Sequence, residues 1–250
     1  MKLLITTRVD HNLTDWVKLT HPLIRKYAAR VGADFAILDE AFNCTAAATG
    51  IGWGVYQYRI MKLYDLHEQY DRIISFDSDM IISPNCPNLF DVVPYDSVGT
   101  IYEDVGSRRP QRIERIMESQ RQFGDINWRE GYINTGVFIT SRCHRDIYQP
   151  IDGKYFTDWG TDDIHLGYQI NKLGYKTSPL SYKFNHMTMF SEDWNGNPDR
   201  FDSHIIHYAG VGIFDESEID ENLLLKQKQQ IDRQCAKLEQ ARLDCERWYR

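Results

Sequence analysis

The amino-acid sequence predicts an α/β fold with a mostly parallel central sheet and helices on both of its faces. Two observations support this prediction. Short runs of β-branched and aromatic residues alternate with segments of helical spacing over the first two thirds of the 250 residues, and this alternation is typical of strand–helix–strand units. Several strand-like runs also end in polar or glycine-containing segments, where sheets of this class bind their ligands.

The N-terminal part of the chain predicts a strand, a helix and a second strand. Lys2–Thr7 is a short run of β-forming residues. In Asn12–Val31, apolar residues recur every three or four positions, which indicates a helix with a local irregularity at Pro22. Asp34–Leu38 is again short and apolar, as expected of a strand. Thr7 and the residues after it should therefore lie at a ligand-binding edge of the sheet.

A loop, a helix and a third strand follow. Phe42–Gly54 is aperiodic and contains glycines and small residues, so it predicts a loop. Val55–Tyr70 has helical spacing. Arg72–Phe76 is rich in β-branched residues and predicts a buried strand that ends directly in Asp77-Ser78-Asp79.

The rest of the first 215 residues predicts two strands with a helix between them, then another helix and a last strand. In order, these elements are Ser97–Tyr102, Ile113–Phe123, Ile133–Thr140, Asp162–Leu173 and His204–Tyr208. Gly174 is expected to end the second of these helices, because glycine adopts the backbone conformation that follows a helix.

Composition excludes several classes of protein. Lys and Arg number 29 against 36 Asp and Glu, a net charge of −7, which opposes general attraction to DNA, RNA or anionic lipid. No apolar run approaches the roughly 20 residues that span a bilayer. The five cysteines are odd in number and none has CxxC spacing, which favours neither disulfides nor zinc. We expect a cytoplasmic protein with no integral membrane segment and no nucleic-acid partner.

The C-terminal segment differs in composition from the rest. Residues 1–215 are expected to form one domain, and residues 216–250 a helical extension without glycine or proline. Its apolar positions form a heptad pattern that Lys228 and Arg242 interrupt. The interrupted pattern favours a helix packed on the domain over the alternative, a helix that pairs two copies into a homodimer.

Asp77 and Asp79 are the first candidate metal ligands. Two carboxylates two residues apart, at the end of a buried strand, can converge on one cation, and oxygen ligands suit Mg²⁺ or Mn²⁺. The alternative is an ordinary turn, in which aspartate is common. His207 ends another apolar strand and could add a nitrogen ligand, although one histidine among eight could equally be a core residue. The glycine-containing run Ala209–Gly212 that follows would let the backbone approach a phosphate.

Five segments resemble one known family. They are Lys62–Asp79, Asn88–Asp91, Tyr132–Ile139, Asp162–Leu166 and Ile206–Gly210. They are similar, in the same order, to the donor-site core, the Leu-Phe segment, the Phe-Asn-x-Gly-Val strand, the Asp-Gln helix start and the His-Phe-x-Gly motif of family 8 glycosyltransferases. These are glycogenin-like and lipopolysaccharide galactosyltransferase-like enzymes of the GT-A fold. The resemblance spans residues 1 to about 212.

The resemblance implies roles for individual residues. Asp77, Asp79 and His207 would hold Mn²⁺ (or Mg²⁺), and Asp77 would also touch the donor ribose. The remaining donor contacts would come from Thr7, Asp10, Lys62, Asn134, Gly136 and Gly210. Asp162 and Asp163 would lie beside the transferred sugar as the catalytic carboxylates, and the helix dipole at their position should keep them ionised. The alternatives from the residues alone are a turn at Asn134, a surface lysine at Lys62, and a helix N-cap with first-turn charge at Asp162 and Asp163.

The function implied by the resemblance is metal-dependent transfer of a sugar, with retention, from a nucleotide-diphosphate donor. UDP-sugar is the expected donor, and a hydroxyl of a glycan, a protein or a lipid-linked sugar is the expected acceptor. One departure is that the family's Lys-Pro-Trp segment is replaced by Val211–Phe214, for which Arg108 and Arg109 could compensate unless they are surface charges. The alternatives are a catalytically silent binding protein of the same fold and, less favoured because no glycine follows the first strand, a nucleotidyltransferase.

Overall fold

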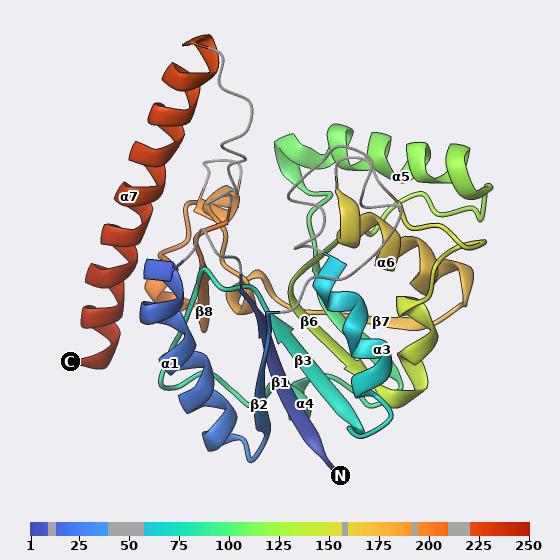
Figure 1. The fold of residues 1–250 in the computed structure, drawn as a ribbon, viewed down its shortest axis with the longest axis horizontal. Coiled ribbons are helices and arrows are strands. Elements are labelled where there is room, and N and C mark those ends of the chain that lie inside the picture. The colour runs from blue at the N-terminus through green and yellow to red at the C-terminus, as the bar shows by residue number, and fades with distance from the viewer. Residues whose placement is uncertain (10–13, 40–57, 157–159, 192–194, 210–220) are drawn as a thin grey trace.

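The computed structural model describes residues 1–250 except 10–13, 40–57, 157–159, 192–194 and 210–220 (Figure 1). For residues 221–234 it describes the backbone only.

A six-stranded sheet forms the centre of the molecule (Figure 1). Its order is β2 (Asp34–Leu38), β1 (Leu3–Arg8), β3 (Arg72–Phe76), β6 (Ile133–Ser141), β5 (Ser97–Tyr102) and β7 (Lys176–Pro179). The pairs β1–β2, β1–β3 and β5–β7 are parallel, whereas β6 is antiparallel to both of its neighbours. The prediction of a mostly parallel sheet is therefore confirmed. The sequence did not predict β7, whose Lys-Thr-Ser-Pro sequence has no apolar run.

Helices cover both faces of this sheet, as predicted. The α-helices of the described residues are α1 (Thr14–Arg30), α3 (Leu63–Leu66), α4 (Leu89–Val92), α5 (Arg109–Phe123), α6 (Thr161–Lys172) and α7 (Glu221–Tyr249), of which α7 packs on α1 and the smaller sheet described below. Figure 1 shows α1 on one side of the sheet and α3, α5 and α6 on the other. Along β1, Leu4 packs with α3 and α6, and Ile5 packs with α1, because successive side chains of a strand point to opposite faces. Helix α1 continues through Pro22.

A second, two-stranded sheet pairs β4 (Met80–Ile82) with β8 (Ile205–His207) in antiparallel register. Met80 lies opposite His207 in this pair. Strand β8 was predicted and β4 was not, because three residues after a turn carry too little pattern to identify a strand. The pairing brings the end of the Asp77–Asp79 turn next to the end of β8.

The helix predicted over Val55–Tyr70 is wrong in its extent. Within the described residues, Tyr58–Lys62 is a 3-10 helix and only Leu63–Leu66 is α-helical. Tyr58, Ile60 and Met61 are almost fully buried. Packing, rather than an amphipathic helical pattern, thus accounts for the apolar residues of this segment. The predicted loop Phe42–Gly54 lies outside the described residues.

The C-terminal half of α7 packs against the rest of the molecule. Ala241 is fully buried and clusters with Trp16, Ile206 and Tyr208. Asp244 is 2% exposed and accepts hydrogen bonds from Arg200 Nε (2.6 Å) and Tyr208 Oη (2.7 Å). These contacts agree with the favoured alternative of a packed helix, although the division at residue 215 and the homodimer both stay predictions.

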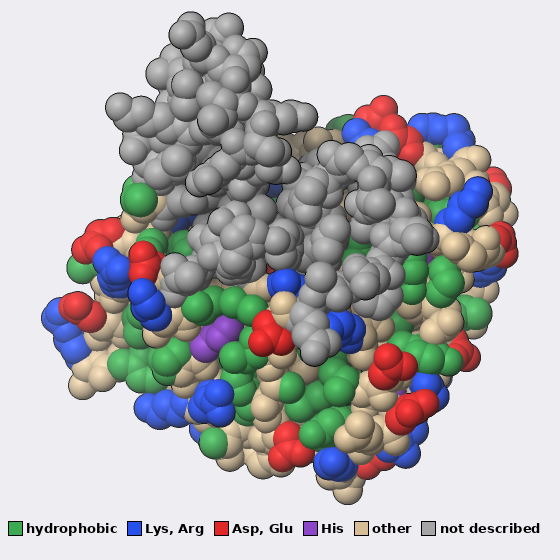
Figure 2. Space-filling model, viewed as in Figure 1, with side chains coloured by type: hydrophobic (Ala, Val, Ile, Leu, Met, Phe, Trp, Pro, Cys, Tyr) green, Lys and Arg blue, Asp and Glu red, His purple; other side chains and the backbone are tan. Residues whose placement is uncertain are grey.

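On the face shown in Figure 2, basic and acidic side chains of the described residues are interspersed rather than gathered by sign. Among the residues that the structure describes, no helix is long and apolar enough to cross a membrane. The cytoplasmic location and the absence of a nucleic-acid partner stay predictions.

We predict that Asp244 anchors α7. In Asp244→Asn the charge that faces Arg200 is lost, and buried donors are left poorly matched, so the free energy of unfolding should fall by about 1–3 kcal/mol. Urea denaturation measures this change. Glu239→Gln, on the exposed side of the same helix, is the control and should change stability by about 0.5 kcal/mol or less. Equal midpoints for the two variants would show that this contact does not hold α7.

Candidate active site

Three predicted metal ligands converge where the two sheets meet. Asp77 follows β3, and its backbone N–H donates to the Gly136 carbonyl (2.9 Å). Asp79 immediately precedes β4, and His207 ends β8. His207 Nε2 lies 3.1 Å from Asp79 Oδ1 and 3.7 Å from Asp77 Oδ2. One ligand atom from each of the three residues lies within 4.8 Å of the others. The structure thus brings together the triad that the sequence singled out.

The pKa values of Asp79 and His207 are each shifted by the charge of the other residue. Burial raises the pKa of Asp79, but the adjacent His207 outweighs this effect and the pKa lies below its ordinary value. Burial lowers the pKa of His207, but Asp79 and Asp77 outweigh it, so this pKa is raised. Two carboxylates facing one imidazole attract a cation, which in the present arrangement is the His207 ring itself when protonated.

The residues fit a small divalent ion. Carboxylate oxygens and an imidazole nitrogen are ligands that Mn²⁺ accepts. Space for an ion is kept by Gly136, since a Cβ there would lie 2.8 Å from His207 Cε1 and 3.0 Å from Asp77 Oδ2. A side chain at this position would therefore enter the space between two of the three ligands.

A chain of buried amides fixes the orientation of His207. Asn134 Oδ1 accepts from the Gly136 N–H (2.9 Å), and Asn134 Nδ2 donates to Glu103 Oε1 (2.7 Å), so both ends of this amide are determined by their partners. Asn185 must then donate its Nδ2 to Asn134 Oδ1 (2.8 Å).

The remaining oxygen of Asn185 consequently faces His207 Nδ1 at 2.7 Å. Because an amide oxygen can only accept, Nδ1 carries a proton, and Nε2 is the nitrogen that faces Asp79 and Asp77 and is left to bind a metal ion. The far end of the chain is Glu103, which is buried and accepts from Arg112 Nε (2.7 Å).

Arg8 connects the triad to the second carboxylate pair. It is the last residue of β1 and is 7% exposed. One Nη donates to Asp77 Oδ1 and the other to Asp162 Oδ2 (2.7 Å). Burial alone would lower the pKa of Arg8, but the two carboxylates raise it above its ordinary value. Arg8 therefore places one fixed positive charge between the predicted metal site and the predicted catalytic pair.

Asp162 and Asp163 lie in the first turn of α6 and contact β6 through Thr135. Thr135 Oγ1 lies 2.8 Å from Asp162 Oδ2 and 2.9 Å from Asp163 Oδ1, and the Thr135 N–H donates to Asp163 Oδ1 (2.8 Å). The N-cap position belongs to Gly160, so neither aspartate is the N-cap, whereas both do place negative charge in the first turn of α6. The turn alternative for Asn134 is also wrong, since Asn134 lies within strand β6.

The backbone before this pair is strained. Thr161 has φ +23° and Gly160 has φ +98°. A Cβ at Gly160 would lie 2.7 Å from Tyr132 Oη. Strain of this kind persists where surrounding contacts fix the backbone, and here the contacts to Arg8 and Thr135 do so.

Burial opposes the effect that we expected of the helix dipole at Asp163. Burial raises the pKa of Asp163 well above its ordinary value, and the nearby Asp162 and Glu103 raise it further. The dipole of one helix end is worth about 1 kcal/mol or less in most settings. It is too weak to offset burial beside two other carboxylates.

The other predicted site residues are connected less directly to the triad of Asp77, Asp79 and His207. Thr7 is fully buried, with its Oγ1 3.4 Å from Ser78 Oγ, directly behind the Asp77–Asp79 turn. Lys62 is half-buried at the end of the 3-10 helix before α3. Arg109 is half-exposed and contacts Asp104 and Glu130. Asp10 and Gly210 lie outside the described residues.

Sequence reasoning missed Arg8, Thr135, Asn185 and Glu103. A signal for Arg8 was present, since an arginine that ends an apolar strand at a ligand-binding edge needs a buried partner. Asn185 had no such signal. It follows a 3-10 helix in an irregular segment, and only the fold brings it to His207.

Comparison with known proteins identifies the fold. No protein-family model and no curated protein match the chain. A glycosyltransferase involved in the glycosylation of the major capsid of PBCV-1 matches 97% of this chain and 100% of its own, with a TM-score of 0.57 and 12% identity. The bifunctional glycosyltransferase WbbM matches 84% of this chain over 46% of its own (TM-score 0.58, 14% identity).

The galactosyltransferase LgtC, solved with donor and acceptor sugar analogues, matches 83% of this chain and 87% of its own (TM-score 0.51, 15% identity). The chain therefore has the fold of GT-A glycosyltransferases, as the sequence predicted.

We predict that Asn185 controls metal affinity through His207. Asn185→Ala removes the acceptor at Nδ1 and should weaken Mn²⁺ binding by roughly 10–100-fold. Asn185→Asp keeps an acceptor there and should bind Mn²⁺ more tightly than Asn185→Ala does. Electron paramagnetic resonance of free Mn²⁺ gives the affinities.

The control is Asn171→Ala, which removes an amide bonded to the Gly167 carbonyl in α6 and should leave Mn²⁺ affinity unchanged. Mn²⁺ affinity of Asn185→Ala equal to that of the wild type would show that His207 is not a ligand, or is not oriented by Asn185.

We predict that Asp163 costs stability at neutral pH. Its raised pKa means that the folded chain keeps a proton over a pH range in which the unfolded chain has lost it, so stability falls as the pH rises through that range. Asp163→Asn removes this dependence. The Tm of the variant should exceed that of the wild type at pH 7, and the difference should shrink as the pH approaches 4. A variant that is less stable than the wild type at pH 7 would contradict a raised pKa for Asp163 in the folded chain.

Proposed function

We propose that this chain is a metal-dependent glycosyltransferase that moves a sugar from a nucleoside-diphosphate donor to a hydroxyl acceptor. The observation that carries the proposal is the convergence of Asp77, Asp79 and His207 at the carboxyl edge of a GT-A sheet. A set of two carboxylates and one imidazole, of which only Asp77 is partly exposed, suits a divalent ion that also binds phosphate oxygens.

In this proposal the metal ligands are Asp77, Asp79 and His207, and the ion is Mn²⁺ or Mg²⁺. The ion would act as a Lewis acid that stabilises the negative charge developing on the leaving diphosphate. The protein holds its part of the site rigid through the amide chain from Asn185 to Glu103. Such preorganisation means that little reorganisation is needed as the charge develops.

The second carboxylate pair would lie beside the transferred sugar. Arg8 bonds Asp162 and Asp77 together, and burial, Asp162 and Glu103 raise the pKa of Asp163 above its ordinary value. In its protonated form Asp163 can donate a hydrogen bond to a sugar hydroxyl. Asp162 is then the group positioned to stabilise positive charge at the reacting carbon or to accept the proton of the acceptor hydroxyl.

The finer assignments rest on the resemblance in sequence. They are a uridine nucleotide as the carrier, retention of configuration, a glycan, protein or lipid-linked acceptor, and donor contacts from Thr7, Asp10, Lys62, Asn134, Gly136 and Gly210. Two features of the structure support the proposed donor contacts. Asn134 and Gly136 border the triad directly, and Thr7 lies behind it.

We predict that turnover requires Asp79. Asp79→Asn keeps size and removes the charge of a metal ligand, so Mn²⁺-dependent hydrolysis or transfer should fall by about 100-fold or more. The assay uses a panel of UDP-, GDP- and dTDP-sugars with and without MnCl₂. Asp91→Asn, an exposed aspartate of α4, is the control and should retain full activity.

Turnover that survives full chelation by EDTA would contradict the metal assignment. A wild-type chain that binds a nucleotide-sugar with Mn²⁺ but turns over none of the panel, with or without simple sugar acceptors, would favour the catalytically silent alternative.

A further inference from the structure

The C-terminal helix reaches the edge of the metal triad through one lysine. Lys237 of α7 is half-buried, and its Nζ donates a hydrogen bond to the Ala209 carbonyl at 2.6 Å. Ala209 lies two residues after His207 and directly follows Tyr208, whose N–H donates to the Asp79 carbonyl (3.0 Å). The ammonium group is thus fixed beside the strand end that carries one metal ligand and pairs with the loop that carries another.

The electrostatics agree with this placement. Among the influences on Asp79, burial raises its pKa and His207 lowers it, and the charge of Lys237 acts in the same direction as His207. Lys237 is therefore close enough to Asp79 for its charge to be felt at the triad, although it belongs to a helix about 160 residues further along the chain.

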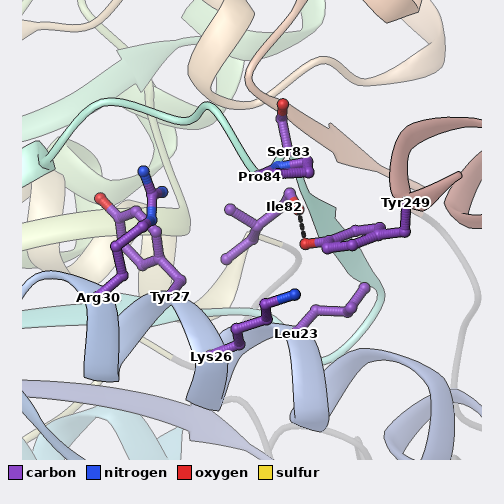
Figure 3. A pocket seen from close by; sticks show the side chains of 8 residues that line it. All are labelled: Leu23, Lys26, Tyr27, Arg30, Ile82, Ser83, Pro84 and Tyr249. Carbon is purple, nitrogen blue, oxygen red and sulfur yellow. Dashed lines mark hydrogen bonds between the residues drawn. The ribbon is translucent and has the colours of Figure 1, made fainter.

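The helix that carries Lys237 is firmly attached. Positions 237, 241, 244 and 248 share one face of α7, at helical spacing. Ala241 and Trp248 pack with β4, β8 and α1, and Asp244 binds Arg200 and Tyr208. At the C-terminal end, Tyr249 Oη donates to the Ile82 carbonyl (2.6 Å), beside Lys26 and Leu23 of α1 (Figure 3). These contacts make Lys237 a positioned cation and not the end of a loosely held tail.

A diphosphate at the triad needs positive charge beyond that of the metal. The other described cation at the triad, Arg8, is bridged to Asp77 and Asp162 and offsets their charge. Lysine binds phosphate as a compact point charge.

Building on the proposed function, we propose that Lys237 binds the diphosphate of the donor together with the metal ion, and that α7 is therefore part of the active site. The helix then has two roles, since it covers the β4–β8 sheet and supplies a cation to the leaving group. Lys237 would stabilise the departing diphosphate without touching the sugar.

The test is isothermal titration with UDP and with UMP, each in saturating MnCl₂. Lys237→Met should weaken UDP binding about tenfold or more, which is the usual loss for a hydrogen bond to a charged group. UMP has one phosphate, so its affinity should change much less. Lys237→Arg should restore most of the UDP affinity, and Lys237→Met should not weaken Mn²⁺ binding without nucleotide, because it removes a positive charge near the triad.

The matched control is Arg242→Met, which removes one positive charge from the exposed side of the same helix and should leave UDP affinity unchanged. UDP affinity of Lys237→Met equal to that of the wild type would overturn the inference. So would equal losses for UDP and UMP together with a lower Tm, because they indicate that Lys237 only attaches the helix. A wild-type chain that binds none of UDP, GDP and dTDP with Mn²⁺ would instead overturn the proposed function, and the inference with it.

Discussion

The fold places five buried or half-buried carboxylates at one edge of its sheet. Its stability depends on how the negative charges of these groups are offset. Asp77, Asp79, Asp162, Asp163 and Glu103 lie within one connected network. Like charges so close repel strongly in a medium of low dielectric constant. Each is offset in a different way: Arg112 pairs with Glu103, Arg8 with Asp77 and Asp162, His207 with Asp79, and Asp163 has a raised pKa. A divalent ion between Asp77, Asp79 and His207 would complete this balance.

The same network joins parts of the fold that are remote in sequence. Arg8 ends the first strand and Asp77 follows the third. Asp162 lies in the first turn of α6, which packs on the face of the sheet opposite α1. The antiparallel β4–β8 pair adds His207, and α7 covers that pair. A site built in this way is held by strands and long helices, which is the arrangement that keeps ligand atoms in place. Loss of any one contact should be felt at the metal position before it is felt in the overall fold.

Most of the fold and the three candidate metal ligands could be predicted from the sequence, through periodic and local signals and, for His207, through the resemblance to a known family. Arg72–Phe76 is an apolar strand that ends in two aspartates, and strand ends are where ligands bind in such sheets. What could not be predicted depends on contacts between distant segments. Asn185 acts on His207 only through the fold, β4 is three residues long, and the pKa of Asp163 is set by burial and by neighbours that no local pattern reveals. The prediction of one helix over Val55–Tyr70 is wrong for a related reason, because its apolar residues lie in a buried 3-10 helix.

The central claim is that Asp77, Asp79 and His207 bind a divalent ion that in turn binds a nucleoside diphosphate. The most direct measurement is a crystal structure of the wild-type chain grown with MnCl₂ and UDP, with the ion located by its anomalous scattering. The account predicts one Mn²⁺ bonded to both aspartates and to His207 Nε2, with oxygens of both phosphates completing its coordination. UDP bound with no ion at the triad, or Mn²⁺ bound only at other positions, would contradict it.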